Sequence, residues 1–317
     1  MHHFITGIAG FIGSQLADAL LADGHRVSGI DDLSRGRLSH LDGARSGDDF
    51  RFQECDCSDP RAATAALAGA CEWGGTPDLV WAMAANSDIA AGVADASIDY
   101  SRTMGTTFGL LEAARKAGVR HIAFASTSAV YGERQDVLTE DSGPLLPISN
   151  YGAAKLASEA LLSAAAETFL ERIWIFRFPN VVGPRATHGA LFDFIARLRD
   201  DPTRLIVLGD GTQTKPYLHV AELIEAMRLI VERADGKRNV LNIAPEGPGT
   251  SVAFMARQVA ARVAPEAEIV YTGGDRGWIG DVPRFSYSTE RLAAMGWSAR
   301  LGSDAAVQRA IYDLAAR

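Results

Sequence analysis

The chain has 317 residues, of which 47% are hydrophobic and 22% are charged, and its formal net charge is −8. Because a single core rarely grows beyond about 250 residues, this length favours one large domain plus a smaller one, and the composition is that of an ordinary globular protein. The acidic balance argues against an electrostatic surface for nucleic acid or an anionic membrane.

Cysteine content and hydropathy narrow the class further. Cys55, Cys57 and Cys71 are odd in number and lack the paired spacing of a zinc site, so we expect reduced thiols and no metal. No apolar run reaches the roughly 18 residues of a membrane span, and the first strand is expected within a few residues of Met1. We therefore expect a cytoplasmic protein.

Short apolar runs alternate with helical segments through the first half of the chain. We expect strands near 3–6, 26–30, 50–55, 78–83, 120–126 and 172–177, and helices near 12–23, 60–70, 96–117 and 151–170. This rhythm predicts an α/β fold with a doubly wound parallel sheet (Rossmann), covered by helices on both faces and joined by right-handed crossovers.

The rhythm loosens after Pro179. Short strand candidates at 205–208, 217–220 and 240–243 lie among glycine and proline clusters. We expect a dinucleotide-binding domain over 1–178, with a returning segment near 220–244 that extends its sheet. A smaller substrate-binding domain is expected over 179–317.

The stretch from Phe4 to Gln15 contains the most informative turn. Gly7, Gly10 and Gly13 stand between an apolar run and a helical pattern. In such a turn the first glycine permits the bend, the second lets the backbone approach a pyrophosphate, and the third lets the helix pack closely on its strand. The turn predicts dinucleotide binding.

The second apolar run ends in Asp31, near the position where an acid contacts the adenosine ribose in such folds. A carboxylate there accepts hydrogen bonds from the ribose diol and repels the extra phosphate of NADP, so we expect NAD. Arg35 is the competing signal, because an arginine after this strand can accommodate a 2′-phosphate. A solvated loop arginine is the interpretation that we favour.

Tyr151 and Lys155 stand four residues apart in an expected helix that Ser149 or Asn150 can cap. A cation at that spacing favours the phenolate, so Lys155 is expected to lower the Tyr151 pKa from about 10 toward working pH. Tyr151 is then a candidate general base. The spacing alone is common on helices, and it gains weight from the glycine turn, Asp31 and the Ser/Thr cluster near Thr127.

With these motifs in order, the chain resembles the extended short-chain dehydrogenase/reductase family, above all its NAD-dependent nucleotide-sugar epimerases and dehydratases. The resemblance covers nearly the whole chain. It rests on Gly7-x-x-Gly10-x-x-Gly13, Asp31-Asp-Leu-Ser34, Asp56, Ala84-Ala85, Thr127 with Val130-Tyr-Gly132, Tyr151 to Lys155, Arg177-Phe-Pro-Asn-Val-Val-Gly-Pro184, Gly209-Asp-Gly-Thr-Gln213 and Tyr217-Leu-His-Val220.

The resemblance implies Tyr151, Lys155 and Thr127 as catalytic residues. It implies that NAD is bound by Gly7, Gly10, Phe11, Ile12, Gly13, Asp31, Asp32, Ser34, Asp56, Cys57, Ala84, Ala85, Tyr151, Lys155 and Phe178. It implies that a nucleotide sugar, with a UDP-sugar favoured, is bound by Asn86, Ser128, Asn180, His188, Leu191, Lys215, Tyr217, Arg276 and Asp281.

Some positions depart from the family pattern. Ala82 replaces a common histidine, Thr103 replaces a common asparagine, and Lys215-Pro216 replaces Arg-Asp. A lysine neutralises phosphate as a point charge but cannot form the bidentate fork of arginine. Arg276 is followed by two extra residues before the Gly-Asp pair that ends at Asp281.

The sequence favours an epimerase acting at C4 of a UDP-hexose or hexuronic acid through a transient 4-keto intermediate. A 4,6-dehydratase or decarboxylase of this family carries acids after the catalytic threonine, where this chain has Ser128 and Ala129. A 4-keto reductase stays open. A non-catalytic NAD-binding protein is a remote alternative, because both Tyr151 and Lys155 are present.

Other residues invite a functional interpretation, and most suit packing. Tyr100, Phe108, Leu110 and Leu111 suit the packing of an apolar helix, and the helices near 96–117 and 151–170 are expected to form a homodimer seam. His219 in a strand-like run is expected to be structural. His188, in a glycine-rich loop, is left between substrate contact and structure.

Overall fold

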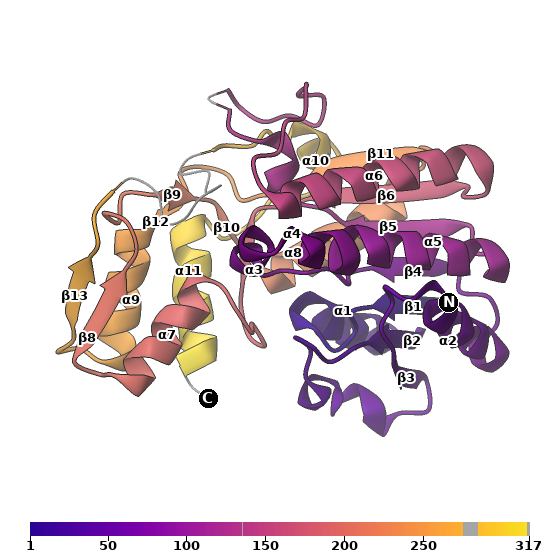
Figure 1. Ribbon diagram of the computed structural model, residues 1–317, viewed down its shortest axis with the longest axis horizontal. Helices are drawn as coiled ribbons and strands as arrows, with labels where there is room; N and C mark the ends of the chain where they lie inside the picture. Colours follow the sequence, from indigo (N-terminus) through magenta and orange to yellow (C-terminus); the bar gives the residue numbers. More distant parts are fainter. Residues whose placement is uncertain (135, 275–284, 316–317) are drawn as a thin grey trace. The chain divides into compact units, whose positions relative to one another are not determined.

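A computed structural model of the chain describes residues 1–134, 136–274 and 285–315 (Figure 1). The chain divides into two compact units that interleave along the sequence. The first unit comprises Met1–Val130, Leu145–Arg177 and Met227–Leu241, and the second comprises Tyr131–Pro144, Phe178–Ala226 and Asn242–Arg317. Phe178 begins a segment of the second unit, and residues 131–144 also group with that unit.

The first unit is built on a seven-stranded sheet in the order β11-β6-β5-β4-β1-β2-β3. β1 lies parallel to β2 and β4, β2 to β3, β4 to β5, and β5 to β6, which confirms the predicted doubly wound arrangement. The strands are β1 His2–Thr6, β2 Arg26–Asp31, β3 Phe50–Glu54, β4 Leu79–Ala82, β5 His121–Ala125, β6 Arg172–Arg177 and β11 Arg238–Asn242.

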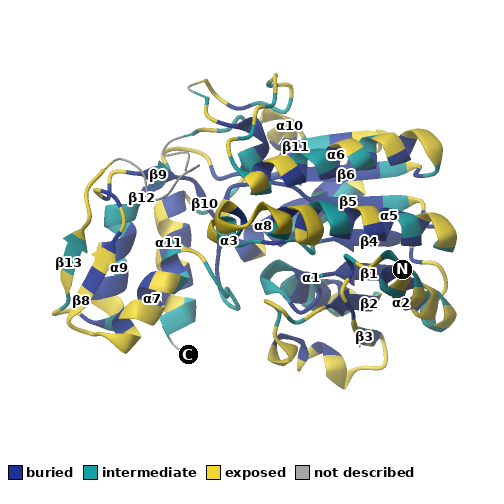
Figure 2. Cartoon of the chain, viewed as in Figure 1, coloured by how far each residue is buried: buried dark blue, intermediate teal, exposed yellow. Residues whose placement is uncertain are grey.

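The inner strands of this sheet are buried on both faces, as a parallel sheet requires, whereas the edge strand β3 is largely exposed. Along β4, Val80 and Ala82 join a core with α2, α5 and α6, while Trp81 points to the other face and stacks on Phe176 at 6.4 Å between ring centroids. The helices are α1 Phe11–Ala22, α2 Pro60–Gly74, α3 Ile89–Ala94, α4 Ala96–Asp99, α5 Thr106–Ala117 and α6 Asn150–Thr168, with short 3₁₀ turns at Leu38–Leu41, Ala44–Ser46 and Ser128–Tyr131. Figure 2 shows the buried strands in dark blue beneath helices with exposed outer sides.

The predicted helix over 96–117 is interrupted. Between α4 and α5 the segment Tyr100–Gly105, labelled η3, is a π-helix. Its wider turn leaves carbonyl groups that side chains can use: the Thr106 and Thr107 hydroxyls donate to the Thr103 carbonyl oxygen at 2.7 and 3.2 Å. Because threonine competes locally for backbone groups, this run of threonines suits the irregular turn.

The second unit has a smaller core formed mainly by α7, α9 and α11. Its strands are paired two by two: β7 Asn180–Val182 with β10 Tyr217–His219, β9 Thr214–Lys215 with β12 Thr250–Ser251, and β8 Arg204–Val207 with β13 Glu268–Tyr271. Its helices are α7 Ala190–Asp200, α9 Val252–Val263, α10 Glu290–Ala294 and α11 Ser303–Ala315, and α8 Val220–Arg233 connects the second unit back to the first. Among the described residues no helix has both the length and the hydrophobicity of a membrane span.

Candidate active site

The glycine turn joins β1 to α1 at the carboxyl end of the sheet. Gly7 has a φ of +70°, and a Cβ on Gly7 would lie 2.9 Å from the backbone nitrogen of Ala84. A Cβ on Gly13 would lie 2.1 Å from the Gly7 carbonyl oxygen. The first glycine therefore permits the turn and the third permits close packing of helix on strand, as predicted.

Gly10 directly precedes α1, and within the described part of the chain no side chain caps the helix start. The first-turn N–H groups, which include those of Phe11 and Ile12, have no acceptors within the helix. They point toward the side where the positive end of the helix dipole favours an anion. This geometry fits the phosphates of a dinucleotide.

Asp31 ends β2 and is only 6% exposed. Its Oδ1 accepts a hydrogen bond from the Leu33 backbone N–H and its Oδ2 accepts one from the Ala9 N–H, both at 2.9 Å. Burial raises the pKa of this carboxyl, and the two backbone hydrogen bonds lower it. Since a carboxylate offers about four acceptor sites, ribose hydroxyls can still bind to it.

Arg35 forms an ion pair with Asp88, which occupies the guanidinium that a 2′-phosphate would need. Asp32 accepts a hydrogen bond from the Ser34 hydroxyl at 2.6 Å and lies 3.6 Å from the Arg102 guanidinium. Arg35 and Asp32 of this loop are therefore each close to an opposite charge from another segment. The arrangement favours the diol of NAD over the phosphate of NADP.

The remaining predicted cofactor contacts follow β3 and β4. Asp56 is exposed and accepts a hydrogen bond from the Ser58 N–H at 2.8 Å, while Cys57 is buried, which raises the pKa of its thiol to about 12. The Ala84 N–H donates to the Thr6 hydroxyl at 3.3 Å, and Ala85 is partly exposed beside it. Ligands of open α/β sheets bind at these carboxyl ends.

Tyr151 lies in the first turn of α6. Of the two expected caps the structure uses Ser149, whose hydroxyl accepts from the Gly152 N–H at 3.1 Å. The Asn150 amide instead donates to the Gly92 carbonyl oxygen at 2.8 Å and so ties the helix start to α3. Tyr151 is thereby held at a fixed position beside the end of β5.

Lys155, one turn further along α6, is 2% exposed. Its Nζ donates to the Ala125 carbonyl oxygen at 2.6 Å, at the end of β5, and lies 5.9 Å from the centre of the Tyr151 ring. The Thr127 side chain is close enough to the Tyr151 hydroxyl to lower its pKa, and it completes the group. The structure thus brings together all three residues that the sequence proposed as catalytic.

The expected effect of Lys155 on Tyr151 is wrong for the protein alone. Burial raises the pKa of Tyr151 to about 12, the negative charge of Asp99 adds to this rise, and the nearby Thr127 hydroxyl opposes it. Burial also lowers the pKa of Lys155 to about 7, against the charges of Glu159 and Asp99. Sequence spacing indicates that two side chains share a helix face, but it does not reveal how much water they lose.

A buried ion pair supports Lys155 from the next turn of α6. The Glu159 carboxylate bonds the Arg177 guanidinium at 2.6 and 3.0 Å and accepts a hydrogen bond from the Ser126 hydroxyl at 2.5 Å. Arg177 ends β6 and Ser126 follows β5, so the pair joins the helix to two strands. Arginine suits this site because its planar fork matches a carboxylate.

Sequence reasoning missed Asp99, the last residue of α4. It is 1% exposed, and its Oδ1 accepts a hydrogen bond from the predicted substrate residue Asn86 at 2.9 Å. The signal available was a polar line at helical spacing, Asp95, Asp99 and Thr103, within an otherwise apolar segment. Asp95 is exposed, whereas Asp99 and Thr103 are buried.

The predicted substrate residues Asn180, Lys215 and Tyr217 lie on strands of the second unit. Asn180 and Tyr217 are register partners in the β7–β10 pair, and Lys215 pairs with Thr250. Ser128, by contrast, is partly exposed in the turn after Thr127.

Further predicted residues of the second unit differ in exposure. Phe178 is 9% exposed and belongs to the second unit rather than to the dinucleotide-binding unit, and Leu191 is packed in the core of that second unit at 3% exposure. His188 is partly exposed beside the Thr187 hydroxyl at 3.3 Å, and His219 is a hydrogen-bonded structural histidine as expected. Arg276 and Asp281 lie outside the described residues.

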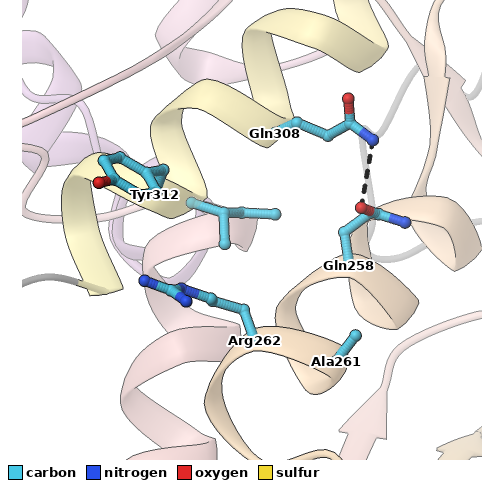
Figure 3. A pocket seen from close by; sticks show the side chains of 6 residues that line it. Gln258, Ala261, Arg262, Gln308 and Tyr312 are labelled. Carbon is cyan, nitrogen blue, oxygen red and sulfur yellow. Dashed lines mark hydrogen bonds between the residues drawn. The ribbon is translucent and has the colours of Figure 1, made fainter.

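A hollow of about 310 Å³ lies between α9 and α11 of the second unit (Figure 3). The Gln308 amide donates to Gln258 at 3.2 Å across it, and the Arg262 guanidinium lies 5.5 Å from the centre of the Tyr312 ring. None of the motif residues described above lines it, so we assign it no part in the site.

Comparison with known proteins agrees with this geometry. Residues 3–244 match the model of the NAD dependent epimerase/dehydratase family. The chain is 36% identical over 233 residues to a UDP-glucose 4-epimerase of Mycolicibacterium smegmatis, covering 71% of this chain and 72% of that one.

Two solved structures are similar over almost the whole chain. A UDP-galactose 4-epimerase has a TM-score of 0.86 at 32% identity, covering 100% of this chain and 99% of that one. The UDP-glucose 4-epimerase of Thermus thermophilus in complex with NAD has a TM-score of 0.85 at 26% identity, covering 99% and 98%. The chain therefore belongs to the NAD-dependent epimerase/dehydratase family, and the predicted cofactor NAD is confirmed at the level of the family.

Proposed function

We propose that the chain is an epimerase that inverts C4 of a UDP-hexose or hexuronic acid. The observation that carries this proposal is the grouping of Tyr151, Thr127 and Lys155 where β5 meets α6. Similarity to proteins named UDP-glucose 4-epimerase and UDP-galactose 4-epimerase supports the choice of nucleotide and carbon.

Tyr151 is the proposed acid and base. Its phenol exchanges a proton with the sugar hydroxyl, and Thr127 hydrogen-bonds the reacting oxygen. When bound, NAD supplies a reversible hydride acceptor, so that a 4-keto sugar can form, turn and be reduced on its opposite face. Lys155 supplies positive charge near the Tyr151 ring, and that charge favours the phenolate.

The raised pKa of Tyr151 sets a condition on this mechanism. With a pKa of about 12 only about one phenol in 10⁵ is ionised at pH 7. Positive charge beside the ring is therefore needed for the proton step, which is a reason to place charged Lys155 in the mechanism. The Nζ of Lys155 donates a hydrogen bond to the Ala125 carbonyl oxygen and lies near the Tyr151 ring.

A dehydratase, a decarboxylase and a 4-keto reductase use the same scaffold and differ in their acids. Elimination across C5 and C6 needs a further proton-transfer group, and Ser128 and Ala129 cannot supply an acid directly after Thr127. Simple epimerisation is therefore favoured. A non-catalytic NAD-binding protein has no need for Tyr151, Lys155 and Thr127 to be grouped in this way.

In the second unit we propose that Asn180, Lys215 and Tyr217 bind the nucleotide sugar, in line with the family resemblance.

We also propose a homodimer formed through η3, α5 and α6. Tyr100 and Phe108 are 66% and 50% exposed on the first two of these elements, which is unusual for large apolar side chains. Sedimentation of the protein and of Phe108→Asp tests this: the variant is expected to be a monomer.

The test of function is turnover on a panel of UDP-, GDP-, dTDP- and CDP-sugars, followed by NMR and mass spectrometry. We expect a UDP-sugar to yield an isomer of unchanged mass without added NADH and without solvent deuterium at C5. A product lighter by water or by carbon dioxide, or deuterium at C5, would contradict the proposal. No turnover on any sugar nucleotide with NAD bound would favour the non-catalytic alternative.

A further inference from the structure

Asp99 is a buried carboxylate with one oxygen unused. Its Oδ1 accepts from the Asn86 amide at 2.9 Å, whereas its Oδ2 has no hydrogen-bond partner among the described residues. The space around Oδ2 depends on Gly92 of α3, because a Cβ on that residue would lie 1.8 Å from this oxygen. Burying an unpaired carboxylate oxygen is costly, so a compensating interaction is expected.

The surroundings of Asp99 place it beside the catalytic helix. It is followed at once by the π-helix η3, a rare element that is frequent at functional sites, and η3 and α4 both contact α6. Charges act in both directions across this contact. Burial raises the pKa of Asp99, and the ammonium of Lys155 opposes this rise. Burial lowers the pKa of Lys155 and raises that of Tyr151, and the carboxylate of Asp99 opposes the first shift and adds to the second.

The other carboxylates that face these groups have partners of their own. Glu159, on α6, also favours the charged form of Lys155, but it is bonded to Arg177. Asp88, before α3, acts on Asp99 by like-charge repulsion, and it is paired with Arg35.

The described charges of η3 are also accounted for. The Arg102 guanidinium lies 3.6 Å from a carboxylate oxygen of Asp32. Among the described residues, Asp99 is the carboxylate near Lys155 for which no ion pair is found.

We propose that Asp99 is a positioning residue whose charge keeps Lys155 protonated and holds the proton on the Tyr151 hydroxyl until substrate is bound. It acts through Lys155 and Tyr151, not on the substrate. The inference rests on the proposed catalytic role of that pair. The carboxylate at this position thus extends to higher pH the range over which Lys155 carries its charge.

The direct test follows the titration of Lys155 by NMR. The lysines of the chain are Lys116, Lys155, Lys215 and Lys237, so labelling of lysine at Cε gives few signals, and Lys155→Met assigns the relevant one. On the NAD-saturated protein, Asp99→Asn is expected to lower the titration midpoint of Lys155 by about 0.5 to 1 pH unit. Asn keeps the shape and can still accept the hydrogen bond from Asn86.

Asp95→Asn is the matched control. Asp95 is exposed at the start of the same helix, where its Oδ1 accepts from the Ser97 N–H at 2.9 Å, and asparagine caps helices equally well. This variant removes the same charge and is expected to leave the Lys155 midpoint unchanged. An equal shift in both variants would show that a general field effect acts, and would overturn the assignment to Asp99.

A second measurement keeps the proposal testable if Asp99→Asn does not fold. Carboxyl NMR of the unmodified protein should show Asp99 ionised at neutral pH, and in Lys155→Met its midpoint should rise by the reciprocal amount. An Asp99 that stays protonated at pH 7, or a Lys155 midpoint that does not move in folded Asp99→Asn, would overturn the proposal. Neither result depends on turnover, so a failure of this proposal can be distinguished from a failure of the proposed epimerase activity.

Discussion

The first unit has two buried aspartates, Asp31 at the end of β2 and Asp99 at the end of α4, and their carboxylates are hydrogen-bonded in different ways. Both are almost fully removed from water, and burial raises the pKa of both. Asp31 receives backbone N–H bonds on both oxygens, from Leu33 and Ala9. Asp99 is bonded by side chains, chiefly Asn86, and its Oδ2 has no partner among the described residues.

This difference separates a carboxylate that shapes a loop from one that acts through its charge. The hydrogen bonds to Asp31 hold the loop that follows the glycine turn and favour the ionised form locally. Fewer hydrogen bonds compensate the charge of Asp99, and this charge affects the pKa values of Lys155 and Tyr151. We therefore expect changes near Asp31 to alter stability and cofactor choice, and changes near Asp99 to alter protonation and turnover.

The largest expected effect is at Tyr151. Replacing it by phenylalanine removes the hydroxyl that transfers the proton and should lower turnover by ~10²–10⁴-fold, while NAD stays bound. The measurement is the rate of product formation beside the amount of cofactor released on denaturation. Near-normal turnover would remove Tyr151 from the mechanism. Loss of NAD would show that the region of Tyr151 also affects cofactor binding, which we assign to the region of Asp31.

Much of the first unit was predictable because its signals are local. The strands follow from apolar runs and the glycine turn from its spacing, and β1, β2, β5 and β6 lie within a residue or two of their predicted ranges. The π-helix in the 96–117 segment was not predictable, because it depends on hydroxyl groups such as those of Thr106 and Thr107 taking up a carbonyl.

For the charged part of the site, the sequence predicts which residues belong to it but not how their pKa values shift. Tyr151 and Lys155 are recognised by spacing, but the direction of their pKa shifts depends on burial by segments far away in sequence. Asp99 belongs to no motif, and its significance comes from contacts with α3 and α6. For the residues of the second unit, the proposed role in substrate binding comes from the family resemblance and not from a local sequence pattern.

The next effect concerns the pH dependence of stability. The pKa of Lys155 is about 7 when folded, against an ordinary value of 10.5, so above pH 7 the unfolded chain binds more protons at this residue than the folded chain. Folding stability from this group therefore rises with pH, by at most about 1.4 kcal/mol per pH unit. The window is pH 7 to 9, because buried thiols such as Cys57 act in the opposite sense above it.

Urea unfolding of the wild-type protein and of Lys155→Met across this window measures the contribution of Lys155. The difference in free energy of unfolding between the two proteins should change with pH in the direction just given. A difference that stays constant from pH 7 to 9 would show that Lys155 titrates at its ordinary pKa.

Asparagine at the two aspartates provides the most direct comparison. In Asp31→Asn one of the two backbone N–H donors would meet an NH₂ group, so we expect a loss of about 1–3 kcal/mol in the free energy of unfolding and a weaker preference for NAD over NADP. Asp99→Asn keeps the hydrogen bond from Asn86 and should be nearly neutral in stability. Unfolding of both variants after removal of the cofactor, and dissociation constants for NAD and NADP, test this; equal losses would contradict the distinction.

The smallest expected effect is at Arg35, whose guanidinium is paired with Asp88 where both side chains are about one third or more exposed. An exposed pair contributes only about 0.2–1 kcal/mol, so Arg35→Ala should scarcely change the free energy of unfolding. Because the pair occupies the guanidinium, the preference for NAD over NADP should change less than in Asp31→Asn. Asp88→Asn sharpens the point: asparagine can still cap α3, but the freed Arg35 should then strengthen NADP binding. Tighter binding of NADP than of NAD by the unmodified protein would show that Arg35, not Asp31, decides the cofactor.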